Sequence, residues 1–214
     1  MNNYQFLEKI GEGSNGDIYR ANDLVNNRQV AIKKVYCYNQ YEVDNYSMMS
    51  QLSYIPQLYD DFIVIDYDQE QYHYLVIELI EGQIIDELIE INCNHDWNWK
   101  ILYRILLLIQ QLHQDGFYHG DISLHNIMLA NDRLYLIDLE SSGQLSKLRS
   151  QELVSKKVRV DYVKVYDNRT FDEQPDYIND NHGLERYRLL REWVAHNDVK
   201  TMIDEWKRID MMIF

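Results

Sequence analysis

One stretch decides the fold: His119-Gly120-Asp121-Ile122-Ser123-Leu124-His125-Asn126. A second segment, Leu136-Ile137-Asp138-Leu139-Glu140, places Asp138 twelve residues after Asn126. Asn126 and Asp138 carry oxygen atoms of the kind that Mg²⁺ prefers as ligands. Asp121 carries a carboxylate that can orient a hydroxyl group and accept its proton. Singly, each residue is better explained by a turn, a loop or a strand end, but their shared order on the chain favours a common chemical role.

A glycine-rich segment lies far upstream: Gly11-Glu12-Gly13-Ser14-Asn15-Gly16-Asp17-Ile18. It is flanked by two strand-like segments, whereas a dinucleotide-binding glycine motif follows a strand and opens a helix. Glycines let a hairpin backbone approach phosphate groups closely. The segment Val30-Ala31-Ile32-Lys33 follows, and strand alternation turns Ala31 and Lys33 to one face. An inward lysine requires an anionic partner, so a solvated edge-strand lysine is the weaker interpretation.

The apolar pattern changes from strand-like to helical along the chain. Strands are expected within residues 4–36 and at Phe62–Tyr67, Tyr72–Leu79 and Leu134–Asp138, and helices at 40–53, 97–114, Leu184–Val194 and Lys200–Met212. This pattern predicts an α+β chain, with a small β-rich first lobe at residues 1–80 that holds one helix. A mostly helical second lobe is expected at residues 81–214, within a single domain.

These motifs together resemble the eukaryotic-type protein kinase superfamily from about Ile10 to Glu140. The resemblance implies a bilobal fold and transfer of the γ-phosphoryl group of ATP, with Mg²⁺, to a hydroxyl group. The nucleotide-binding positions that it implies are Gly11, Gly13, Gly16, Ile18, Ala31, Lys33, the gatekeeper Ile77, and Glu78 and Ile80 of the hinge. The catalytic positions that it implies are Asp121, Lys33 and Asn126, with Asn126 and Asp138 as the metal ligands.

A kinase of this type pairs its strand lysine with a helix glutamate. Glu42 is the only glutamate in the expected helix, and it lies nine residues after Lys33. This spacing is short for the family and requires the helix to begin almost at once. Asp44 is the alternative partner, and Glu42 is the favoured one.

Several positions depart from the family pattern. Gly120 stands where many protein kinases carry arginine, which removes the usual dock for a phosphorylated activation loop. Ser123 stands where Ser/Thr kinases commonly carry lysine, and Asp138-Leu139-Glu140 replaces Asp-Phe-Gly. The segments His119-Gly120-Asp121 and Ile137-Asp138-Leu139-Glu140 also resemble motifs of aminoglycoside, choline and lipopolysaccharide-core kinases. A protein Ser/Thr kinase is therefore the favoured prediction, with a small-molecule or sugar kinase and a pseudokinase binding module as the alternatives.

The part of the chain after Glu140 holds 74 residues, fewer than the usual activation segment and helices of the second lobe. The resemblance is therefore to a minimal member, similar to small kinases of bacterial effectors or viruses. The short second lobe motivates an activating protein partner that completes the enzyme, and the missing peptide-docking segment motivates the small-molecule alternative. A protein substrate is what the resemblance to protein kinases implies.

Composition limits the other classes of function. The formal net charge of −14 repels nucleic acid, and the longest apolar run, Ile105 to Ile109, is too short to span a membrane. Two cysteines are too few for a disulfide framework. The chain is therefore predicted to be cytoplasmic, or to act in the host cytoplasm if it is an effector or a viral protein.

Overall fold

The computed structural model describes residues 3–13, 15–36, 40–65, 69–91 and 95–148. The two helices predicted near the C-terminus lie outside the described residues. Internal contacts divide the chain into two compact units: one holds residues 1–83 and 127–141, and the other holds residues 84–126 and 142–214.

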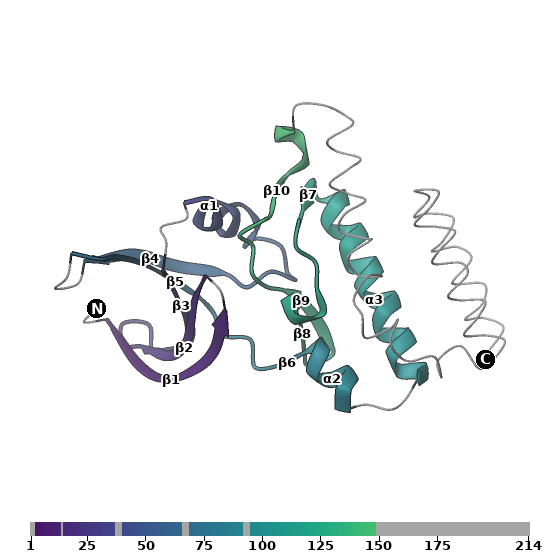
Figure 1. Ribbon diagram of the computed structural model, residues 1–214, viewed down its shortest axis with the longest axis horizontal. Coiled ribbons are helices and arrows are strands. Elements are labelled where there is room, and N and C mark those ends of the chain that lie inside the picture. Colours follow the sequence, from purple (N-terminus) through teal and green to yellow (C-terminus); the bar gives the residue numbers. More distant parts are fainter. Residues whose placement is uncertain (1–2, 14, 37–39, 66–68, 92–94, 149–214) are drawn as a thin grey trace. The chain divides into compact units, whose positions relative to one another are not determined.

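The first unit is built on a five-stranded antiparallel sheet with the order β1-β2-β3-β5-β4 (Figure 1). Its strands are β1 (Tyr4–Gly13), β2 (Gly16–Asp23), β3 (Arg28–Val35), β4 (Leu58–Ile65) and β5 (Gln71–Glu78). The predicted β-rich first lobe is confirmed. Strand β4 begins four residues before its predicted start, because the exposed Asp60 and Asp61 are tolerated in an edge strand.

The sheet is strongly curled, and strand β1 bends around its neighbours (Figure 1). Register shifts interrupt β1 between Phe6 and Gly11 and interrupt β4 between Leu58 and Asp60. Bulges of this kind increase the twist of a sheet. One face carries an apolar cluster of Ala21, Val30, Ile32, Tyr74 and Val76, covered by partly buried aromatic side chains.

Helix α1 (Gln40–Met49) is the single helix among the described residues of the first unit. Helical spacing in the sequence predicts an apolar face of Val43, Tyr46, Met49 and Leu52. The first three are buried, and Leu52 lies beyond the end of the helix. The helix ends at Met49 rather than residue 53, and hydrogen bonds from Ser50 N to Tyr46 O and from Leu52 N to Met49 O close its last turn.

A small sheet of order β6-β8-β9 follows, from Gln83–Ile84, Ile127–Ala130 and Arg133–Leu136. Asn131 and Asp132 both have positive φ, 47° and 59°, which suits a tight two-residue hairpin. Strand β9 was expected to run to Asp138 but ends at Leu136. Asp138 has φ 61°, a left-handed conformation that cannot continue a strand.

The second unit contains α2 (Ile85–Ile91), the long helix α3 (His95–Gln114), and the paired strands β7 (Phe117–Tyr118) and β10 (Gly143–Gln144). It also holds short 3₁₀ helices at Leu124–Asn126 and Leu145–Lys147. Helical spacing predicts an apolar stripe on α3. Its members are all buried except Leu108, which is half-buried: Ile101, Leu102, Ile105, Leu106, Leu108, Ile109 and Leu112. Gly116, with φ 87°, ends the helix. In the described parts of the chain, we find no helix with the length and apolar character that crossing a membrane requires.

Candidate functional site

The buried ammonium group of Lys33 lies between two carboxylates of the first unit. Its Nζ donates to Glu42 Oε1 at 2.6 Å and to Asp138 Oδ1 at 2.9 Å. Lys33 and Ala31 are both buried, as strand alternation predicted. Burial alone would lower the pKa of Lys33, but attraction to Glu42 and Asp138 outweighs it and holds the pKa above its ordinary value. Lys33 is therefore charged, and of the two candidate helix partners it contacts Glu42.

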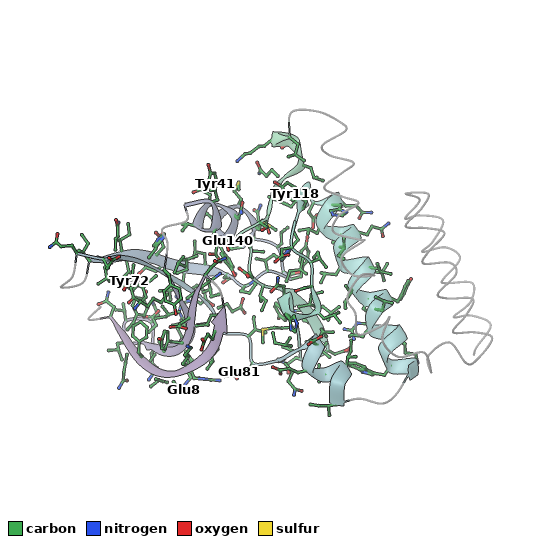
Figure 2. The ribbon with its side chains drawn as sticks, viewed as in Figure 1. Glu8, Tyr41, Tyr72, Glu81, Tyr118 and Glu140 are labelled. Atoms are coloured by element: carbon green, nitrogen blue, oxygen red, sulfur yellow. The ribbon has the colours of Figure 1, made fainter. Side chains whose placement is uncertain are left out.

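The Glu42 carboxyl is fully buried, and this burial raises its pKa although Lys33 opposes the shift. Asp138 and Glu140 raise it further, so the Glu140 carboxylate (labelled in Figure 2) lies within electrostatic range of Glu42. Lys33 thus faces more negative than positive charge. A cation or a cation-bound ligand would relieve this imbalance.

Asp138 is the accessible member of the group. Its side chain is 40% exposed, whereas those of Lys33 and Glu42 are 9% and 1% exposed. Oδ1 accepts from Lys33, and among the described residues Oδ2 accepts no hydrogen bond. The role of Asp138 as a metal ligand, which would use this oxygen, stays a prediction.

Two residues of α1 contact the backbone at and beside Asp138, and the sequence analysis did not predict these contacts. Asn45 Nδ2 donates to Leu139 O at 2.8 Å, and the buried hydroxyl of Tyr46 accepts a hydrogen bond from the Asp138 backbone. Both follow Glu42 by one helical turn, at positions i+3 and i+4. That spacing is the only signal in the sequence that could have pointed to them.

The glycine-rich segment forms the β1–β2 hairpin, and its three glycines have different surroundings. A Cβ atom on Gly16 would lie 2.2 Å from the Lys34 carbonyl oxygen, so the close approach to β3 requires glycine. A Cβ on Gly11 or Gly13 would meet only ordinary contacts, at 3.4 Å and 3.7 Å. Gly16 is therefore explained by packing, whereas packing does not require Gly11 and Gly13. The side chain of Asn15, beside Gly16, donates to the Glu140 carboxylate.

The predicted adenine-binding residues lie on β2, β3 and β5. Ile18 is opposite Lys33, and Ile77 is buried opposite Ala31. In the predicted hinge, the Glu78 N–H donates to Gln57 O, and Ile80 O accepts from the Gly82 N–H. These two backbone groups are already used within the protein.

An arginine of the sheet contacts the hinge segment. Arg20 on β2 donates to both carboxylate oxygens of Glu81, at 2.5 Å and 3.1 Å, and also pairs with Glu8 at 2.9 Å. Glu8 and Glu81 are both labelled in Figure 2. The forked contact with Glu81 joins strand β2 to the segment after β5.

The second unit holds the other predicted catalytic residues. Asn126 Nδ2 donates to Asp121 O at 2.9 Å and lies 3.4 Å from Asp121 Oδ2. His119 is fully buried, and its Nδ1 accepts from the Asp121 N–H at 3.3 Å. Gly120 between them has φ 80°, a conformation that L side chains rarely adopt. The loop therefore needs glycine where many kinases carry arginine.

The donor groups fit a magnesium ion that also binds phosphates. The amide nitrogen of Asn126 is used by Asp121, which leaves the amide oxygen as the end that can bind a cation. Among the described residues, no group of three or more His, Cys, Asp or Glu side chains is arranged to hold a metal by itself. In general, Mg²⁺ binds through one or two carboxylates together with substrate phosphates.

Comparison with known families decides the family of the chain. The protein kinase domain family matches residues 4–164. The chain belongs to this family. The match covers the kinase segments described above, from the glycine hairpin to Glu140.

Similar proteins of this kinase family come from distant organisms. They include probable serine/threonine-protein kinase CA_C1728 of Clostridium acetobutylicum, 30% identical over 61% of this chain and 21% of its own length. Probable serine/threonine-protein kinase 2 of Plasmodium falciparum is 28% identical over 61% of this chain and 26% of its own length. Serine/threonine-protein kinase PrkC of Bacillus subtilis is 30% identical over 59% of this chain and 20% of its own length. The chain thus spans about a quarter or less of the length of these relatives.

Proposed function

We propose that this kinase domain transfers the γ-phosphoryl group of Mg-ATP to a serine or threonine hydroxyl of a protein. The observation that carries the proposal is Lys33, held charged between Glu42 and Asp138. A buried ammonium with two carboxylates is costly to maintain and of little use to a binding module. The names of the similar proteins support the Ser/Thr acceptor.

Each residue has a proposed role in the reaction. Lys33 binds the nucleotide phosphates, and Glu42 holds Lys33 in place. Gly11 and Gly13 let backbone N–H groups of the hairpin approach the phosphates, which agrees with the absence of a packing requirement at either position. Ile18, Ala31 and Ile77 line the adenine, with backbone groups of Glu78–Ile80 as its polar contacts.

Residues of the second unit bind and activate the acceptor hydroxyl group. Asp121 orients the attacking hydroxyl and accepts its proton, while the Asn126 hydrogen bond restrains the Asp121 loop. Asp138 and Asn126 are the proposed ligands of Mg²⁺. When bound, the metal neutralises charge on the phosphates.

The test compares the purified chain with the variants Asp138→Ala, Asp121→Asn and Lys33→Met. Radiolabelled ATP and Mg²⁺ are supplied with a protein mixture as acceptor. We expect labelled phosphoserine or phosphothreonine from the wild type and a loss of at least ~100-fold in each variant. Equal labelling by all four proteins would contradict the catalytic proposal and favour the pseudokinase.

A small-molecule kinase is the second candidate. It is favoured by Gly120 in the catalytic loop and by Glu140 after Asp138, where protein kinases commonly carry arginine and glycine. Screening the same proteins against aminoglycosides, choline and sugars separates the two candidates. Label found only in a small molecule would replace the protein substrate.

Three further proposals extend beyond the described residues. We propose that residues 1–214 act as one kinase domain, that the chain acts in the cytoplasm, and that a protein partner increases its activity. Full activity of the purified chain, without further gain from added cell extract, would exclude the partner.

A further inference from the structure

The backbone at Asp138 is fixed by buried hydrogen bonds from helix α1. Asn45 is 5% exposed, and its Nδ2 donates to Leu139 O at 2.8 Å. Tyr46 is 1% exposed, and its hydroxyl accepts from the Asp138 backbone. Leu139 itself is fully buried. The groups on either side of the Asp138–Leu139 peptide are therefore held by one helix.

Asp138 needs such support because of its conformation. Its φ of 61° lies in the left-handed region, which costs free energy for a residue with a Cβ atom, although less for Asp and Asn than for other residues. Glycine would remove the strain, but it would also remove the carboxylate. A strained residue persists only where its surroundings fix it, and the described contacts of Asn45 and Tyr46 are of this kind.

Three residues of one turn of α1 thus contact Asp138 or Leu139, either directly or through Lys33. Glu42 contacts Lys33, which in turn donates to the Asp138 carboxylate. Tyr46 holds the Asp138 backbone, and Asn45 holds the next carbonyl group. Positions i, i+3 and i+4 lie on one helical face. The direction of the carboxylate is consequently determined at the side chain and at the backbone.

We propose that Asn45 and Tyr46 are positioning residues that orient the Asp138 carboxylate for Mg²⁺. This inference rests on the proposed metal-binding role of Asp138. Groups that orient a metal ligand commonly change metal affinity 10- to 100-fold when they are removed. Loss of either hydrogen bond should thus weaken magnesium-dependent binding and leave the adenine contacts unchanged.

The main test uses Tyr46→Phe, which removes one hydroxyl and keeps the buried ring. Asn45→Ala is the second variant, and it removes the contact with Leu139. Tyr19→Phe is the matched control, because it also removes one tyrosine hydroxyl, which lies 3.3 Å from Asp17. The ring of Tyr19 contacts Phe6, and Phe6 packs on the apolar cluster on the other face of the sheet. ATP affinity of the full chain is measured by calorimetry with excess Mg²⁺ and again with EDTA. The measured quantity is the ratio of the two affinities.

We expect this ratio to fall about tenfold or more in Tyr46→Phe and Asn45→Ala and to stay unchanged in Tyr19→Phe. Hydrogen exchange at the Asp138 amide should also accelerate in Tyr46→Phe, because its acceptor is gone. An equal loss of affinity with and without Mg²⁺ would indicate a purely structural role and overturn the inference. An unchanged ratio in both variants would overturn it as well.

The two proposals fail in different ways. If the wild type binds ATP equally with Mg²⁺ and with EDTA, the metal-binding role of Asp138 is wrong, and the positioning role falls with it. If the wild type depends on Mg²⁺ and both variants retain that dependence, the positioning role alone is wrong. Should Tyr46→Phe fail to fold, Asn45→Ala decides between these outcomes by the same ratio.

Discussion

The ring of Tyr4 stacks on Phe62, with centroids 5.7 Å apart and planes 9° from parallel. Tyr4 lies on β1 and Phe62 on β4, the two opposite edges of the five-stranded sheet. The Tyr4 hydroxyl also donates to Asp60 Oδ2 at 2.8 Å. The sheet therefore curls until its edges meet, and the strands that carry the glycine hairpin and Lys33 belong to a nearly closed structure.

The Tyr4–Asp60 contact predicts a pH dependence. Burial, together with the hydrogen bond to Asp60, raises the pKa of Tyr4 to about 12. Since the folded state holds this proton more tightly than the unfolded state, this contribution to stability is present below the ordinary tyrosine pKa. It is lost as the pH rises from about 10 toward 12.

Ultraviolet titration of tyrosinate checks this prediction. Since burial and nearby carboxylates also raise the pKa of Tyr19, Tyr36 and Tyr46, we expect the late titration step of Tyr4→Phe to be smaller than that of the wild type by the absorbance of one tyrosine. Tyr41, exposed on α1 (Figure 2), gives the control variant Tyr41→Phe, in which the late step should remain. Loss of the late step in Tyr41→Phe instead would contradict the assignment.

The glycine hairpin predicts opposite results for neighbouring positions. Gly16→Ala should lower the free energy of unfolding by ~1–3 kcal/mol, because its Cβ would overlap the Lys34 carbonyl oxygen. Gly11→Ala and Gly13→Ala should change it by about 0.5 kcal/mol or less, yet weaken ATP binding. Urea unfolding and calorimetry measure the two effects. Unchanged ATP affinity in both of the latter variants would argue against phosphate binding by the hairpin.

The hinge segment gives a further packing prediction. A Cβ on Gly82 would lie 2.6 Å from the Leu129 carbonyl oxygen and 2.8 Å from Ala130 Cβ. Gly82→Ala should therefore destabilise the protein by ~1–3 kcal/mol. Gly11→Ala is again the control, and thermal unfolding is the measurement. Equal melting temperatures for the two variants would show that strand β8 shifts to accommodate the added methyl group without loss of stability.

Local sequence patterns predicted the five strands of the first sheet, helix α1 and the burial of Lys33. Strand alternation and helical spacing are sufficient for these elements, since each depends on residues close in sequence. The pairing of Lys33 with Glu42 also followed from position, despite the short spacing of nine residues. The catalytic roles of the site residues remain predictions.

Other features depend on contacts that a local pattern does not contain. In the sequence, Asn45 is an ordinary polar residue of α1. Its role depends on the hydrogen bond to the Leu139 carbonyl group, which is distant in sequence. The left-handed conformation of Asp138 was missed for the same reason, so β9 was predicted too long. The close approach of Gly16 to the backbone of β3 was not predicted either, and the role of Gly16 in phosphate binding stays a prediction. Strands of two residues, such as β6, carry no detectable periodicity.

The last prediction concerns the stability of the Lys33–Glu42 pair. Lys33→Met leaves the buried Glu42 carboxylate without its ammonium partner, which should cost ~3–5 kcal/mol at neutral pH. Burial raises the pKa of Glu42 already in the wild type, and Lys33 is the group that opposes this shift. Without Lys33, the folded state should bind the Glu42 proton still more tightly. The stability of Lys33→Met should consequently be retained at acidic pH and fall as the pH rises above the ordinary glutamate pKa.

The double variant Lys33→Met/Glu42→Gln separates stability from catalysis. It removes both charges while keeping a side chain of similar shape at each position, so most of the lost stability should return. Phosphoryl transfer should stay at least ~100-fold below wild type, because the charge that faces the phosphates is still missing. Urea unfolding at pH 5 and pH 8 and the labelling assay measure these two quantities. Recovery of activity together with stability would mean that the pair serves the fold rather than the reaction.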